Sequence, residues 1–80
     1  MDKKELIAAV AAVLTTALEV GEPCPESSVY LALGGNMEKW EIVRGILLKG
    51  GLITIKGYSI GLTPLGKDTA EKINAALATR

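Results

Sequence analysis

The sequence predicts a mostly helical α+β domain with three helices, a short two-stranded antiparallel hairpin and a C-terminal helix. Three observations lead to this class. Apolar residues recur at helical spacing through the first half of the chain, and glycine pairs at 34–35 and 50–51 end the second and third helices. Two β-prone runs then flank a short glycine-containing loop. At 80 residues, the chain is expected to be a single domain spanning residues 1–80.

The first helix is predicted from an alanine-rich amphipathic run over residues 6–18. Asp2 can cap its start with Glu5 three residues later, and Gly21 supplies its end. The run is too short to span a bilayer, so we expect no membrane segment. Its apolar side chains recur at three- and four-residue steps: Leu6, Val10, Val13, Leu14 and Leu18.

The second helix is short and follows a Pro-x-Pro turn. Pro25 suits the first turn of a helix, and Glu26 suits the positive end of the helix dipole. Gly34 and Gly35 end the helix. Cys24 is interpreted as a small residue at the helix entrance, because no basic neighbour in the sequence would activate its thiol.

The third helix is predicted over residues 37–49, with Asn36 as its N-cap. Its apolar arc is wider than one core-facing stripe, so the helix is either central to the domain or in contact with a partner. The core stripe comprises Trp40, Val43, Ile46 and Leu47, flanked by Met37 and Ile42 and extended by Leu48. The remaining narrow polar arc comprises Glu38, Glu41, Gly45 and Lys49.

The hairpin is predicted from the β-prone runs 52–55 and 58–62, joined at Lys56-Gly57. Strand alternation puts Tyr58, Ile60 and Leu62 on one face. Thr63 then serves as an N-cap with Pro64 at the first helical position, so a final helix is expected over residues 64–78.

Composition narrows the function classes. Nine basic and nine acidic residues give zero net charge, although residues 38–80 are basic on balance. A 49% hydrophobic share in so short a chain favours burial against a second copy, so a homodimer is expected. One cysteine and no histidine predict a cytoplasmic protein that is not an enzyme and holds no metal or cofactor.

Two strings carry a resemblance to a known fold family. Gly51-Leu52-Ile53 joins the third helix to the hairpin, and Leu62-Thr63-Pro64-Leu65-Gly66-Lys67 joins the hairpin to the last helix. The second string is similar to the L-T-x-x-G junction of small bacterial and archaeal winged-helix proteins. Over residues 4–78 the chain therefore resembles the winged helix-turn-helix superfamily, with the hairpin as the wing.

The resemblance implies a regulator of transcription that binds double-stranded DNA with its third helix in the major groove. The residues expected to contact DNA are Lys39, Arg44, Lys49, Lys56, Ser27 and Ser28. The sequence departs from this role on the exposed arc of the third helix, where Glu38, Glu41 and Gly45 replace the usual basic and amide side chains.

The alternative is a winged helix used for protein contact or self-association without DNA binding. The wide apolar arc and the zero net charge favour this interpretation. An exposed glycine inside a helix costs about 1 kcal/mol relative to alanine, so a close approach by a partner would explain Gly45. The residues expected to contact such a partner are Met37, Trp40, Gly45 and Leu48.

Overall fold

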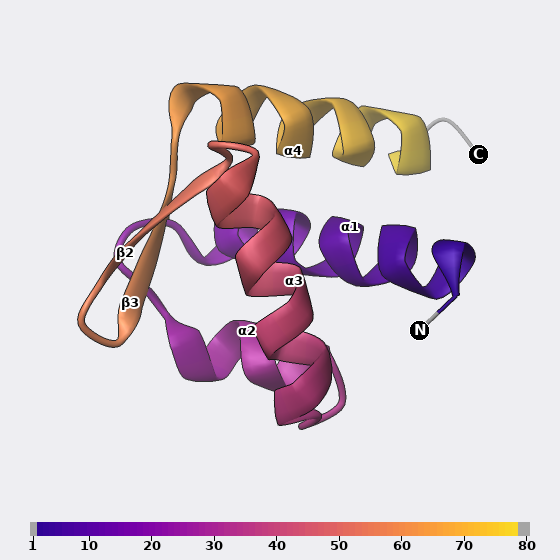
Figure 1. The fold of residues 1–80 in the computed structure, drawn as a ribbon. Helices are drawn as coiled ribbons and strands as arrows, with labels where there is room; N and C mark the ends of the chain where they lie inside the picture. The colour runs from indigo at the N-terminus through magenta and orange to yellow at the C-terminus, as the bar shows by residue number, and fades with distance from the viewer. Residues whose placement is uncertain (1, 79–80) are drawn as a thin grey trace.

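The computed structural model describes residues 2–78, which form four helices and a small three-stranded antiparallel sheet (Figure 1). The mostly helical α+β class is confirmed, as is the position of each predicted helix. In chain order the elements are α1 (Lys3–Val20), β1 (Cys24–Pro25), α2 (Glu26–Ala32), α3 (Met37–Lys49), β2 (Ile53–Lys56), β3 (Ser59–Leu62) and α4 (Pro64–Ala78).

The predicted caps set the helix boundaries. The Asp2 carboxylate accepts the backbone N–H of Glu5 at 2.8 Å, and the Asn36 side chain accepts that of Lys39 at 3.0 Å. Each bond satisfies a donor that the first helical turn leaves without a partner. Gly21 ends α1 at a φ of +83°, a conformation that favours glycine.

The junction between the hairpin and α4 explains the L-T-x-x-G string. Thr63 Oγ1 accepts the N–H of Gly66 at 3.0 Å and donates to the Gly51 carbonyl at 2.6 Å. This hydroxyl therefore ties the start of α4 to the end of α3. A Cβ at position 66 would overlap the carbonyl oxygen of Leu52, so only glycine fits there without a shift of the backbone.

The core lies where α3 crosses α1, with α2, α4 and the sheet closing it (Figure 1). The helices α1 and α4 run side by side in opposite directions. Trp40 is the largest fully buried side chain, and the packing around it is aliphatic. Among the described residues, the other large side chains that are fully buried are Val13, Leu14, Cys24, Val29, Val43, Leu47 and Ile60.

The sheet has one strand more than the two expected. β1 pairs with β3, with Cys24 opposite Ile60 and Pro25 opposite Ser59, which gives the strand order β1-β3-β2. Pro25 consequently lies in a strand and precedes α2, whereas the sequence placed it in the first helical turn. A two-residue strand is too short to show alternation, so β1 leaves no periodic signal in the sequence.

The hairpin loop is also displaced by one residue from its predicted position. Lys56 pairs with Ser59, so the two loop residues are Gly57 and Tyr58, and the expected Lys56-Gly57 loop is wrong. Gly57 has a φ of +58°, which suits glycine as the first residue of a type II′ turn. Tyr58 therefore projects from the turn, 88% exposed, and does not share a strand face with Ile60.

Candidate functional site

The outward surface of α3, together with the hairpin, is where the predicted contact residues lie. Lys49 is exposed at the last turn of α3, and Lys56 is exposed beside the hairpin turn. Lys39 is half-buried at the first turn of α3. Within residues 2–78 none of these three lysines has a carboxylate within 4 Å. Ser27 and Ser28 lie in the first turn of α2, exposed and half-buried respectively.

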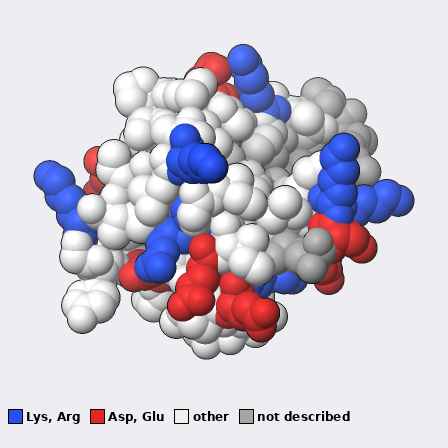
Figure 2. Space-filling model, in the orientation of Figure 1, with Lys and Arg blue, Asp and Glu red and all other residues white. Residues whose placement is uncertain are grey.

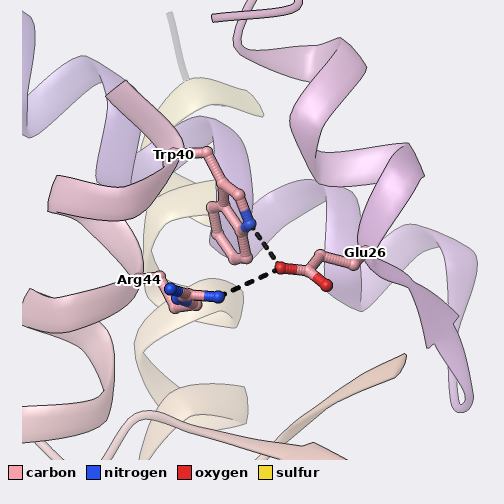
Figure 3. A network of polar contacts seen from close by, with 3 residues as sticks. All are labelled: Glu26, Trp40 and Arg44. Carbon is pink, nitrogen blue, oxygen red and sulfur yellow. Dashed lines mark hydrogen bonds and ion pairs between the residues drawn. The ribbon is translucent and has the colours of Figure 1, made fainter. Parts of the chain in front are cut away.

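Arg44 does not project freely, because it belongs to a polar network with Glu26 and Trp40 (Figure 3). The indole Nε1–H of Trp40 donates to Glu26 Oε1 at 2.6 Å. The Arg44 guanidinium donates to the same oxygen at 3.4 Å, with the Arg44 and Glu26 side chains 40% and 22% exposed. One carboxylate oxygen thus satisfies a buried indole and neutralises the only arginine of α3.

The backbone places Glu26 in this position. Its N–H donates to the Tyr58 carbonyl at 2.8 Å, which extends the β1–β3 pairing by one residue. Glu26 is also the first residue of α2, where the helix dipole favours a negative charge. The sequence identified the favourable helix position of Glu26 but not its partners, which lie 14 and 18 residues further along the chain.

Trp40 is buried, so the prediction that it contacts a partner protein is wrong. Its side chain is 0% exposed, so it belongs to the core and cannot form part of a surface patch. The physical reason is its helix position, since Trp40, Val43 and Leu47 lie on the face of α3 that packs against the rest of the domain.

The exposed arc of α3 combines carboxylates with aliphatic side chains. Glu38 and Glu41 are exposed, and among residues 2–78 a Cβ at Gly45 would meet no atom within 4 Å apart from the backbone of its own helix. On the described part of the face in Figure 2, basic and acidic side chains are interspersed and form no continuous basic strip. Four large apolar residues of α3 are exposed: Met37, Ile42, Ile46 and Leu48.

The prediction that Ile46 belongs to the core stripe of α3 is wrong. Although it shares the apolar side of α3 with Trp40 and Val43, it is 40% exposed. It borders an apolar groove of about 460 Å³ between α1, α3 and α4. The residues lining this groove include Leu6, Ile7 and Val10 of α1, Ile46 of α3, and Ile73 and Leu77 of α4.

This groove has no clear signal in the sequence. Ile7 falls beside the apolar stripe of α1, and Leu77 lies near the end of α4. Ile7, an apolar residue outside the core-facing stripe of α1, was the one sequence feature that could have indicated an exposed apolar surface. Helical periodicity does not show which helices leave a groove between them, because that depends on how the helices pack.

A second hollow, of about 520 Å³, lies on the outer face of the sheet. It is lined by Glu22, Thr54, Lys56 and Ser59 together with backbone near Gly61. The polar residues that line it are exposed or half-buried, so the hollow does not enclose its polar groups away from solvent.

The acidic residues and the single cysteine are the side chains of the described chain best suited to bind a metal ion or act as a nucleophile. Between residues 2 and 78, no three His, Cys, Asp or Glu side chains are grouped so that they could hold a metal ion. The Cys24 side chain is buried, and this burial raises the pKa of its thiol, which disfavours the reactive thiolate. None of the helices in that range has the length and hydropathy of a membrane span.

Comparison with protein-family models, with curated proteins and with solved structures finds no match to this chain.

Proposed function

We propose that this chain is a winged helix that acts by contacting protein rather than duplex DNA. The winged-helix part of the proposal is supported by the element order, in which a short strand separates α1 from α2 and a hairpin follows α3. The pairing of β1 with the hairpin also supports it, because the hairpin is thereby attached to the start of α2.

The proposal of protein contact is supported mainly by the residues on the outward face of α3. Two exposed carboxylates, Glu38 and Glu41, would face the phosphates of a duplex, and each would repel them. The same face exposes Met37, Ile42 and Leu48, whose burial by a partner protein is favourable because it removes apolar surface from water.

The internal use of Arg44 supports the same conclusion. A DNA contact by Arg44 would compete with its ion pair with Glu26, in which Arg44 Nη1 lies 3.4 Å from Glu26 Oε1. The carboxylate would then remain close to the approaching phosphate backbone. Lys39, Lys49 and Lys56 would be the remaining cations opposed to the two glutamates of α3, which is a weak excess for a DNA-binding face.

DNA binding is the second candidate, favoured by one observation. Lys49 and Lys56 are exposed and, within residues 2–78, have no carboxylate within 4 Å, so both are available to phosphates. In this case α3 would enter the major groove, with Lys56 contacting the backbone beside it.

A titration of fluorescently labelled random duplex, followed by anisotropy, separates the two candidates. Protein contact predicts no saturable binding at low salt. Binding that weakens steeply with added salt would overturn the proposal, since that dependence reports phosphate contacts.

A pair of charge-matched double variants sharpens the test. Replacing both glutamates of α3, Glu38→Lys with Glu41→Lys, should create salt-dependent DNA binding if the acidic residues are what prevents it. The control makes the same charge change at exposed sites on α1 and α4, Glu19→Lys with Glu71→Lys. Equal gains in both would show that net charge alone attracts DNA, and would remove α3 as the determining surface.

A further inference from the structure

The outward face of α3 is centred on Gly45. With about 3.6 residues per turn, position 45 lies on the side of the helix opposite the buried residues. Among residues 2–78, a Cβ there would meet no atom within 4 Å apart from the backbone of its own helix. Ile42 and Leu48, three residues to either side, are both 44% exposed. An exposed glycine within a helix is less favourable than alanine, so packing within the domain does not explain glycine at this position.

Opposite charges flank Gly45 at equal distances along α3. Glu41 precedes it by four residues and Lys49 follows it by four, so the three residues form one row along the helix surface. Both charged side chains are exposed, and among residues 2–78 neither has an oppositely charged group within 4 Å. They lie about 12 Å apart along the helix axis, which is too far for them to pair with each other. Both charges are therefore available to a partner.

We propose that α3 packs against α3 of a second copy of the chain, with the two helices crossing at Gly45 about a two-fold axis. The dimer rests on the proposed protein-contact function, for which it supplies the partner. Rows of residues four positions apart run parallel in two helices that cross at about 50°, the commonest packing angle. A two-fold axis through Gly45 reverses one row against the other. Glu41 thus lies beside the partner's Lys49, and Lys49 lies beside the partner's Glu41.

Gly45 and its apolar neighbours suit a close crossing of this kind. Because position 45 carries no side chain in either copy, the two helix axes can approach to about 8 Å, the lower end of the usual range. Ile42 and Leu48 lie on the two sides of the crossing, where each faces its counterpart in the partner and is removed from water. The contact thereby explains why an exposed helix position is occupied by glycine.

Self-complementarity favours a second copy over a different protein. One row supplies both members of each ion pair, so two identical faces match without any further charged residue. The hollow on the outer face of the sheet also contains opposite charges, Glu22 and Lys56, but none of the described residues lining it is an exposed large hydrophobic residue. A two-fold contact there would pair charges while burying little apolar surface, whereas the face of α3 does both.

A contact between single helices is small, and its size sets the expected strength. Two crossing helices bury less than the roughly 800 Å² per partner of a standard interface, so the dimer belongs to the weak class. We expect monomer and dimer to exchange with a Kd between about 10 μM and 1 mM. In sedimentation equilibrium over that concentration range, the average mass should rise from 8.4 kDa toward twice that value.

Charge reversal tests the ion pairs. Glu41→Lys and Lys49→Glu should each raise the Kd about tenfold at low salt, because each replaces two attractive contacts per dimer with two repulsive ones. The double variant restores opposite charges across the axis and should regain the wild-type Kd. An equimolar mixture of the two single variants should form a heterodimer for the same reason. The matched control, Glu38→Lys, makes the same charge change further from the crossing and should alter the Kd by less than about twofold.

Gly45→Ala tests the close crossing. The substitution places a methyl group from each copy where the helices are nearest, so the Kd should rise about tenfold. In the dilute monomer the same substitution should raise the free energy of unfolding, because alanine has the higher helix propensity. A variant that is more stable and yet associates less assigns Gly45 to the contact, since damage to the fold would weaken both.

Two results would overturn the dimer. One is a wild-type chain that stays monomeric at about 1 mM, the upper end of the expected Kd range. The other is a dimer whose Kd responds equally to Glu38→Lys and Glu41→Lys and is unchanged by Gly45→Ala. A monomeric wild type leaves contact with a different protein through α3 intact. Salt-dependent binding of random duplex by the wild type would instead overturn the proposed function.

Discussion

Replacing Glu26 by alanine should destabilise the domain more than any other change to a surface charge. The substitution removes the acceptor of the Trp40 indole N–H, which lies 2.6 Å from Glu26 Oε1 in a side chain that is 0% exposed. A buried donor left without a partner costs about 1–3 kcal/mol. The Arg44 ion pair adds only about 0–1 kcal/mol, because both of its side chains are partly exposed and screened by solvent.

These contributions, with a further fraction of a kcal/mol from the helix dipole, predict that Glu26→Ala lowers the free energy of unfolding by about 1–5 kcal/mol. Glu26→Gln keeps an acceptor oxygen while losing the charge, so it should cost about 1 kcal/mol. Arg44→Ala leaves the indole bond in place and should cost less than about 1 kcal/mol. The three variants thus separate the hydrogen bond from the ion pair.

Urea unfolding monitored by the fluorescence of Trp40, the only tryptophan, measures all three changes. The indole proton resonance provides a local readout and should move in Glu26→Ala while staying close to its wild-type position in Arg44→Ala. An Arg44→Ala cost as large as that of Glu26→Ala would show that the ion pair, and not the indole hydrogen bond, dominates. A Glu26→Ala cost below about 0.5 kcal/mol would show that the indole N–H is not left buried without a partner, since an unpaired buried donor costs about 1–3 kcal/mol.

Three further predictions concern glycines and the cysteine. Gly66→Ala should lower the free energy of unfolding by about 1–3 kcal/mol, because its Cβ would overlap the Leu52 carbonyl oxygen. Gly45→Ala, also within a helix but with open space around it, should raise that free energy by about 0.5–1 kcal/mol in the same urea assay. A decrease in the free energy of unfolding for Gly45→Ala would contradict the finding that a side chain at position 45 has open space around it. The native Cys24 thiol should alkylate far more slowly than a cysteine placed at Leu31 in a Cys24→Ser background. Burial raises the pKa of the Cys24 thiol, so the unfolded chain ionises first and the free energy of unfolding should fall as pH rises past about 8.5. Cys24→Ser should abolish that part of the alkaline loss.

Local signals in the sequence were sufficient for the helices. The caps at Asp2, Asn36 and Thr63 form the bonds expected of them, because an N-cap involves only residues within three positions of itself. The glycine stops follow the same logic, as Gly21 and Gly51 adopt positive φ values that depend mainly on the local backbone.

The sheet was less predictable because pairing joins distant residues. The loop residues 56–58 allow more than one two-residue turn, and only the Lys56–Ser59 pairing selects Gly57-Tyr58. β1 becomes a strand because β3 lies beside it, with Cys24 opposite Ile60. Nothing in its own two residues specifies that structure.

The sequence by itself determined where α1, α3 and α4 begin and end, and that the outward arc of α3 carries Glu38, Glu41 and Gly45. Tertiary structure decided how the other candidate residues are used. It buried Trp40, paired Arg44 with Glu26 across 18 residues, and left Ile7 and Ile46 beside an open groove. The physical reason is range: caps and turns form between neighbours in the chain, whereas burial and ion pairing depend on which elements pack together.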